Sequence, residues 1–306
     1  MTVSKNEIIS DYVVVLGSGL SVNDLNPKER VLINSCPTKI GINKYAAFYK
    51  KAEISPTHVY FLDDFSHSSV LILKHIINFL KKQSFKEVNF ILSKGYIGYF
   101  KKTKFSYLLS KVISGINLFF YKTLIFLLRK TLKTLKYDIF ISIKNRIQYL
   151  LKPKDLIKFN VIPDNFKLEY ISVQNWIARG NKWATTIKED LYHYRGSLTT
   201  VLNYISINFP NKKILFVGVD FNSPHYFFQE ELNKLNISAT DWTSEFINTE
   251  KKHFSIIDYK NTKIDDEFPF IIKSLKETGN TIYSVSEKAY LVEKGFIQTI
   301  KLNTIN

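Results

Sequence analysis

The stretch DYVVVLGSGLSVNDL, from Asp11 to Leu25, decides the fold that the sequence predicts. Its apolar run ends in Gly-Ser-Gly, and a helical pattern follows. A buried strand over Tyr12–Leu16 that enters a glycine turn and then a helix is typical of the first unit of an α/β domain. Backbone amides at such a helix start can bind an anion. The turn lacks the third glycine of GxGxxG and the lysine of a Walker loop, so it is also compatible with a plain tight turn.

The rest of the chain repeats this alternation of strands and helices. Strands are predicted in THVYFLDDF, EVNFILS, FKLEYISV, KKILFVGVDF and TIYSVS, while VLINSC and KIGINKY suit short strands or turns. Helices are predicted over 67–82, in SLTTVLNYISINF and near 268–278. This order predicts an α/β fold, with a Rossmann-like parallel sheet and helices on both faces.

The composition predicts a folded protein that attracts polyanions. The chain has 306 residues, 45% of them hydrophobic, and a formal net charge of +16. Such a charge favours nucleic acid, anionic lipid or phosphorylated substrates as partners. The only cysteine is Cys36, which excludes an internal disulfide and fits a reducing cytoplasm, and no signal peptide is recognisable.

Most of the positive charge lies in the middle of the chain. Residues 101–154 contain 13 Lys and Arg and one acid, Asp138, between strongly apolar runs. At about 100° per residue, six of the basic residues share an arc of roughly 60° on a helix. They are Lys104, Lys111, Lys122, Arg129, Lys133 and Lys136. This pattern predicts a helical region in an anionic membrane interface, although a core helix pair with one basic edge also fits. No nucleic-acid motif is present, so nucleic acid is not expected as a partner.

We therefore expect three regions along the chain. Residues 1–96 and 161–306 form the two parts of one nucleotide-binding α/β domain, and residues 97–160 form a basic, amphipathic helical insertion. Residues 222–252 are polar and are expected to form a small lid segment.

Several polar residues follow the predicted strands, where ligands bind in parallel sheets. Gly218 and Asp220 end a strong strand, and Gly196 and Ser197 stand at a helix start. Structural explanations exist for each: Asp220 can cap the next turn, and Ser197 can be an ordinary N-cap. His253 is a lone histidine, which is more often structural than catalytic. No histidine shows metal-ligand spacing, and the pair Asp63–Asp64 is a weak candidate for a metal site.

The order of these pieces resembles the bacterial lipooligosaccharide sialyltransferases that use CMP-sialic acid. The family turn GNGPS corresponds to Gly17–Ser21, in which Ser18 replaces the asparagine, and the family CNQF corresponds to GINKY around Asn43. The family TSG and SGIDFY resemble RGS at Arg195–Ser197 and VGVDFN at Val217–Asn222. The resemblance covers roughly residues 10–100 and 165–295, and similar enzymes transfer 3-deoxy-octulosonic acid (Kdo) from CMP-Kdo.

The resemblance implies a site and a mechanism. It implies a GT-A-like variant of the fold and a glycosyltransferase that moves a keto-acid sugar from a CMP donor to a glycan or lipid-linked acceptor. His253 would be the general base, and Asp220 would be the nucleophile if configuration is retained. The implied binding residues are Gly17, Ser18, Gly19, Ser21, Asn43, Asp63, Arg195, Gly196, Ser197, Gly218, Phe221, Tyr226 and Ser286.

A CMP leaving group carries one phosphate, so neither a metal nor another cofactor is expected. Action on lipid-linked acceptors predicts a peripheral location at the cytoplasmic face of the bacterial inner membrane. Two alternatives remain open at this point: a metal-dependent transferase that uses a UDP-sugar, with Asp63 and Asp64 on the ion, and a non-enzymatic α/β protein that binds membranes or polyanions.

Overall fold

The computed structural model describes most of the predicted α/β domain. It describes residues 2–3, 6, 10–62, 73, 76–77, 88–94, 166–174, 182–223, 225–234, 253–258 and 261–302. These residues belong to one compact unit built from residues 1–94 and 163–306. The predicted basic insertion, Asp63 and Asp64, most of the helix over 67–82 and most of the lid lie outside the described residues.

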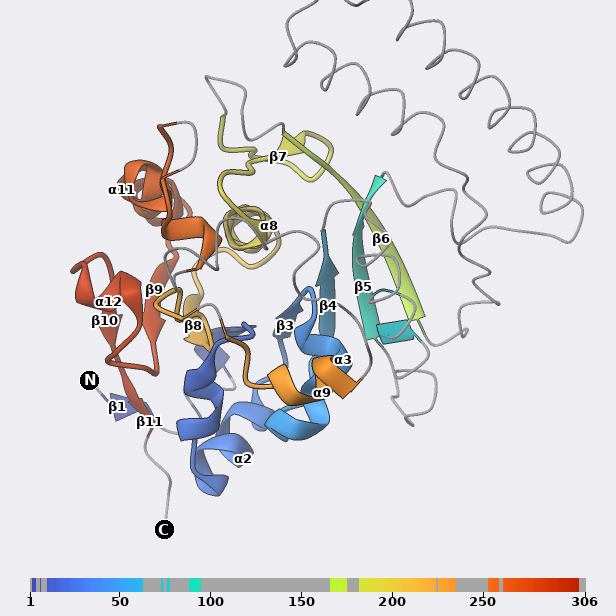
Figure 1. The fold of residues 1–306 in the computed structure, drawn as a ribbon. Helices are drawn as coiled ribbons and strands as arrows, with labels where there is room; N and C mark the ends of the chain where they lie inside the picture. Colours follow the sequence, from blue (N-terminus) through green and yellow to red (C-terminus); the bar gives the residue numbers. More distant parts are fainter. Residues whose placement is uncertain are drawn as a thin grey trace, which may run out of the picture. The chain divides into compact units, whose positions relative to one another are not determined.

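The centre of this unit is a nine-stranded sheet, in which neighbouring strands pair in parallel (Figure 1). The strand order is β10-β9-β8-β2-β3-β4-β5-β6-β7. The strands are β2 (Tyr12–Leu16), β3 (Lys39–Ile42), β4 (His58–Phe61), β5 (Val88–Ser93), β6 (Phe166–Val173), β7 (Asp190–Leu191), β8 (Lys213–Val217), β9 (Thr281–Ser284) and β10 (Gln298–Thr299). A separate parallel pair joins β1 (Thr2–Val3) to β11 (Lys301–Leu302). The predicted α/β class and Rossmann-like parallel sheet are confirmed.

The order of the strands reverses between β2 and β8. The chain moves outward from β2 through β3 to β7 and then returns to the other side of β2 to form β8. The two central strands pair along their length, from Tyr12 with Lys213 to Leu16 with Val217. In open parallel sheets, ligands bind beyond the carboxyl ends of the strands at such a reversal. The glycine turn after β2 and the turn after β8 therefore lie at the expected ligand position.

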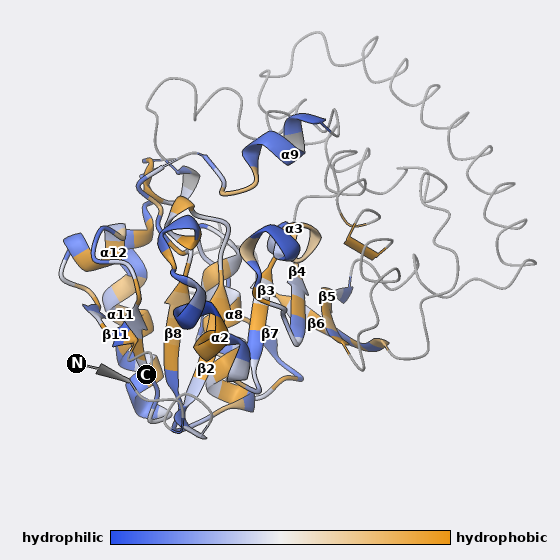
Figure 2. Ribbon diagram, turned by 90° about the horizontal axis from the view of Figure 1, so that it is seen from below, coloured by the Kyte–Doolittle hydropathy of each residue, from blue (hydrophilic) through white to orange (hydrophobic). Residues whose placement is uncertain are grey.

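Helices cover both faces of the sheet (Figure 1). On one face lie α2 (Pro27–Ser35) and α3 (Tyr45–Ala52), and on the other lie α8 (Ser197–Asn208) and α11 (Ile264–Glu277). All five residues of β2 are buried because both faces of this strand are covered. Val13 and Val15 pack into the same core cluster as Leu202 of α8 and Ile271 of α11. Figure 2 shows β2 and β8 as hydrophobic, whereas the short helix α9 (Gln229–Lys234) is hydrophilic.

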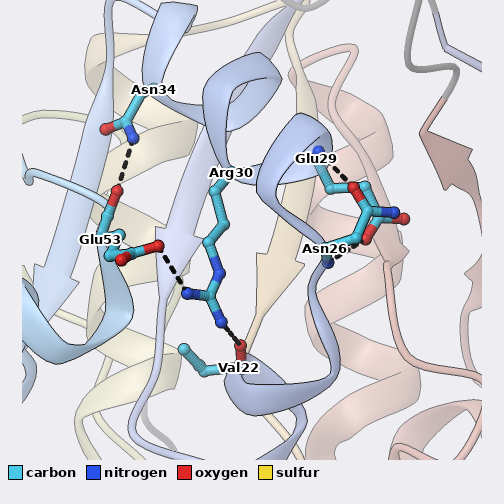
Figure 3. Close-up of polar contacts among 6 residues, drawn as sticks. All are labelled: Val22, Asn26, Glu29, Arg30, Asn34 and Glu53. Atoms are coloured by element: carbon cyan, nitrogen blue, oxygen red, sulfur yellow. Dashed lines mark hydrogen bonds and ion pairs between the residues drawn. The ribbon is translucent and has the colours of Figure 1, made fainter.

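One predicted element is wrong: VLINSC belongs to a helix and not to a strand. Asn26 is the N-cap of α2 and accepts a hydrogen bond from the Glu29 amide at 2.9 Å, while the Glu29 carboxylate accepts from the Asn26 amide at 2.9 Å (Figure 3). Pro27 occupies the first turn, where its missing N–H costs nothing. These residues begin a helix ahead of the apolar run, and the run forms the rest of that helix.

Arg30 of α2 links the elements that support the glycine turn. Its guanidinium donates to the Glu53 carboxylate at 2.8 Å and to the carbonyl of Val22 at 3.5 Å (Figure 3). Val22 belongs to the 3-10 helix η1 (Leu20–Asp24), which follows the glycine turn, and Glu53 ends α3. Asn34 adds a hydrogen bond to the Glu53 carbonyl at 2.7 Å. The start of η1 is therefore tied to two helices on one face of the sheet.

One further boundary differs in detail. Helix α11 begins at Ile264 instead of near residue 268, because the Asp266 carboxylate accepts from the Lys263 amide at 2.7 Å and caps an earlier first turn. The remaining short helices are η4 (Phe254–Ile256) and α12 (Tyr290–Glu293). Among the described helices, none is long and apolar enough to cross a membrane.

Candidate functional site

The turns after β2 and β8 touch through their glycines. The Gly17 amide donates to the carbonyl of Val217 at 2.8 Å, and the Gly19 amide donates to the carbonyl of Gly218 at 2.7 Å. Gly218 has φ +69°, and a Cβ there would stand 2.5 Å from the Val22 side chain. The close approach of the two turns therefore requires glycine at these positions.

These hydrogen bonds also decide which amide of the turn can meet an anion. The amides of Gly17 and Gly19 both donate to β8 and its turn, and a role of these two residues in phosphate binding stays a prediction. The Ser18 carbonyl accepts from the Phe227 amide at 3.1 Å. Among the amides of Gly17–Gly19, that of Ser18 makes no hydrogen bond with the part of the chain that the structure describes, so it is available to a ligand.

Asp220 joins three segments at this edge of the sheet. It is 6% exposed, and its carboxylate accepts from both the amide and the hydroxyl of Ser21, at 2.8 and 2.5 Å. Its carbonyl accepts from the Tyr290 amide at 2.8 Å. Burial raises the pKa of Asp220, and the hydrogen bonds from Ser21 oppose that shift. Both carboxylate oxygens hold the start of η1, and the role of Asp220 as a nucleophile stays a prediction.

Asn43 and Ser197, predicted from distant motifs, bind each other. The Asn43 side chain donates to the Ser197 hydroxyl at 3.0 Å and accepts from the Leu62 amide at 3.0 Å. The Ser197 hydroxyl in turn donates to the Leu62 carbonyl at 2.8 Å. These bonds fasten the end of β3 to the start of α8 and to the residue before Asp63. Asn43 and Ser197 were predicted to bind a ligand, whereas in the structure these side chains bond each other and the main chain of Leu62.

Arg195 and Gly196 pack against η4. Arg195 is 1% exposed and has φ +56°, and its guanidinium donates to the Ile257 carbonyl. Its own carbonyl accepts from the Ser255 hydroxyl at 2.8 Å. Gly196 has φ +135°, a backbone conformation that side chains rarely adopt, and its missing Cβ leaves room beside the same hydroxyl. The buried guanidinium of Arg195 thus contacts the segment that contains His253.

His253 is the N-cap of η4, and its ring is held on two sides. Its Nδ1 accepts a hydrogen bond from the Ser255 amide at 3.2 Å. The centre of its ring lies 5.0 Å from that of Phe221, which follows Asp220 in the turn after β8. Burial, together with the positive charges of Lys44 and Arg195, lowers the pKa of His253 to about 4. The imidazole is therefore neutral at pH 7.

Lys44 is a residue of the candidate site that the sequence did not reveal. It is 2% exposed, and its Nζ lies 5.0 Å from the centre of the Tyr226 ring. The Tyr226 ring stacks on Phe228 at 5.2 Å, and Phe228 stacks on Phe48 of α3 at 4.2 Å. The signal was a lysine placed directly after the strand-end Asn43. Tyr226, predicted as a ligand contact, thus lies beside a buried cation.

The turn after β9 completes this edge. The Asn222 side chain donates to the Lys288 carbonyl at 2.5 Å. Within the turn, the Ser284 hydroxyl bonds both the amide and the carbonyl of Ser286, at 3.1 and 3.2 Å. Ser286 therefore lies in the turn after β9, and its amide and carbonyl bond the Ser284 hydroxyl within that turn.

The structure thus gathers most of the predicted residues at the carboxyl edge of the sheet. Asp63 lies outside the described residues. Within the described ranges, no group of three or more His, Cys, Asp and Glu is arranged to hold a metal ion. Comparisons with protein-family models, with curated proteins and with solved structures give no match.

Proposed function

We propose that the chain is a glycosyltransferase that transfers a keto-acid sugar, sialic acid-like or Kdo, from a CMP donor to a glycan or lipid-linked acceptor. One observation carries the proposal. Two buried cations, Lys44 and Arg195, act on the neutral His253 at the point where the strand order reverses. This is the position at which parallel sheets bind nucleotides.

The charge of the site supports a doubly anionic donor. In a CMP-activated keto-acid sugar, the phosphate and the carboxylate are attached to the same carbon. The positive charges of Lys44 and Arg195 both act on the ring of His253, and the Ser18 amide adds a backbone donor. Buried positive charges attract anionic groups strongly, because the surrounding protein screens them less than water does. A ligand with two anionic groups therefore matches the site better than a neutral sugar.

The proposal includes a GT-A-like variant of the fold and a lid over residues 222–252. Two hydrogen bonds support the lid: Asn222 is bound to the turn after β9, and Phe227 is bound to the carbonyl of Ser18. The start of the lid segment is thus held beside the glycine turn. Lid segments of this kind exclude water from the reacting atoms when they close.

The proposal also includes the acceptor side of the reaction. A transferase for lipid-linked acceptors works at a membrane, and the basic residues of 97–160 would hold it peripherally on the anionic cytoplasmic leaflet of the bacterial inner membrane. No metal or other cofactor is needed, because the phosphate monoester leaves with its charge balanced by Lys44 and Arg195.

Binding of nucleotides by calorimetry tests the proposal. We expect CMP to bind in the presence of EDTA and UDP to bind more weakly, and we expect CMP-sialic acid or CMP-Kdo to be consumed. A preference for UDP with Mn²⁺ would instead indicate the metal-dependent transferase. Binding of neither nucleotide would leave the non-enzymatic, polyanion-binding alternative.

A matched pair of variants tests the charge argument. Lys44→Met keeps the length of a buried side chain and removes its charge, and we expect it to weaken CMP binding by roughly 10-fold to 100-fold, as for the loss of a charge-assisted hydrogen bond. Lys276→Met, on the exposed side of α11, is the control and should leave affinity unchanged. Equal CMP affinity in both variants would remove Lys44 from the site, provided that circular dichroism shows both variants folded.

A further inference from the structure

We propose that His253 acts as a hydrogen-bond donor to the departing phosphate, and not as the base that takes the acceptor proton. The inference rests on the proposed function and names the chemical group that His253 serves. Its Nε2–H, together with the cations of Lys44 and Arg195, forms the site for the phosphate monoester of CMP.

The hydrogen bond at Nδ1 decides the position of the proton on the ring. The Ser255 amide is a donor and nothing else, so Nδ1 must offer its lone pair to that bond. A neutral imidazole carries one proton, which therefore resides on Nε2. A base would need a lone pair on Nε2, and the tautomer that provides it would turn Nδ1–H toward the Ser255 N–H.

The movement of charge during the reaction leads to the same assignment. A base becomes an imidazolium, which would add a third positive charge beside Lys44 and Arg195. The leaving phosphate instead gains negative charge, which both cations stabilise. The same surroundings that disfavour a base therefore favour a neutral donor.

Phe221 and the capping bond orient the ring. The Phe221 ring lies against it at 5.0 Å, at an interplanar angle of 42°, and Nδ1 is fixed by Ser255. Phe221 belongs to the turn after β8, so the ring is positioned relative to the reversal of strand order. Residues held by two such contacts need little reorganisation when charge develops on the ligand.

The bonds of the proposed step balance as follows. The bond between the anomeric carbon and the phosphate oxygen breaks, and its electron pair stays on the phosphate, which accepts the hydrogen bond from Nε2. The acceptor oxygen forms the new bond to the anomeric carbon, and its proton passes to solvent water. His253 holds the same proton before and after the transfer.

A spectroscopic experiment tests the tautomer directly. In protein labelled with ¹⁵N in its six histidines, the His253 signals are assigned by their loss in His253→Asn, and His225→Asn serves as an exposed control. We expect a protonated Nε2 and an unprotonated Nδ1 at pH 7, and a shift of the Nε2–H proton when CMP is added. A protonated Nδ1 would overturn the proposal.

A kinetic experiment separates the donor role from the base role. His253→Asn keeps an acceptor for the Ser255 amide, so η4 stays capped, and it removes Nε2. We expect it to slow transfer by roughly 10²–10³-fold, equally for a sugar hydroxyl acceptor and for a phenol that is already ionised. A loss that disappears with the ionised phenol would identify a base and overturn the donor role. If the wild type consumes no CMP-sugar with either acceptor, the proposed function itself fails, and the donor role fails with it.

Discussion

Two roles are compared for the buried Asp220 carboxylate: a nucleophile in the reaction, and a structural acceptor for Ser21. Its two oxygens both accept hydrogen bonds from Ser21. Asp220→Asn preserves both bonds, because an amide can accept from the Ser21 amide and donate to its hydroxyl. We expect this variant to lose about 1 kcal/mol of unfolding free energy or less, and Asp220→Ala to lose about 2–4 kcal/mol by leaving the Ser21 groups unsatisfied. Urea unfolding of both variants measures the difference.

The same Asn variant tests the retaining mechanism. If Asp220 only positions η1, CMP-sugar turnover should fall less than about 10-fold in Asp220→Asn, since its geometry is preserved. A nucleophile replaced by an amide should lose activity by roughly 10⁴-fold or more. Such a loss, together with a covalent adduct on the wild-type carboxylate, would return Asp220 to the nucleophile role.

Three buried histidines predict that the free energy of unfolding decreases in acid. Burial lowers the pKa of His58, His193 and His253 to about 4. The unfolded chain, with histidine pKa values near 6.5, binds more protons than the native state between pH 6.5 and 4, so stability falls as the pH falls through this window. Each histidine should cost roughly 1–2 kcal/mol by pH 5.

One variant isolates this contribution. His58→Gln removes one titrating ring that bonds Thr57 and Asn89. We expect a smaller loss of unfolding free energy between pH 7 and pH 5 than in the wild type, measured with urea at both pH values. An identical loss in both proteins would show that His58 does not contribute.

Residue types alone predicted the region of the candidate site, but they did not predict the contacts within it. Strand-end polar residues pointed to the carboxyl edge because parallel strands end together there. The bond between Asn43 and Ser197 was not predictable, since the two residues lie far apart in the sequence and either side chain could have faced a ligand. Lys44 was missed because a lysine is normally exposed, and only tertiary packing buries it.

Among the contacts between elements, the one between the turns after β2 and β8 depends on a residue without a side chain at Gly218. Gly218→Ala places a Cβ against Val22 in a left-handed conformation, whereas Gly295→Ala has a similar φ of +72° with open space around it. We expect a loss of about 1–2 kcal/mol for Gly295→Ala, from the backbone alone, and about 1–3 kcal/mol more for Gly218→Ala from overlap. Thermal and urea unfolding compare the two, and equal losses would contradict the close approach.

Strands were easier to predict than helix starts in this chain. The strand in KILFV is continuous, apolar and buried, which is typical of parallel sheets. VLINSC is also a short apolar run, and periodicity cannot separate such a run from part of a helix. The capping residues Asn26 and Glu29 before it carried the deciding information.

At the scale of the whole molecule, the basic region leads to a membrane prediction. Changing Lys122, Arg129, Lys133 and Lys136 to Gln removes four charges. At about 1 kcal/mol per basic residue near an anionic surface, binding to phosphatidylglycerol vesicles should weaken by orders of magnitude. Turnover on a short soluble acceptor should persist, because the candidate site is built from other segments. Co-sedimentation at low and high salt measures this, and equal binding to neutral vesicles would contradict an electrostatic anchor.

The pairing of β2 with β8 has a consequence for how the protein is made. Tyr12 pairs with Lys213, which follows it by about 200 residues. A ribosome needs roughly 10–40 s to add that many residues. During that interval one edge of the apolar strand β2 has no neighbour, and such edges can pair with other chains. Newly made chains should therefore depend on chaperones until β8 emerges, and the residues of the candidate site come together only in the last third of synthesis.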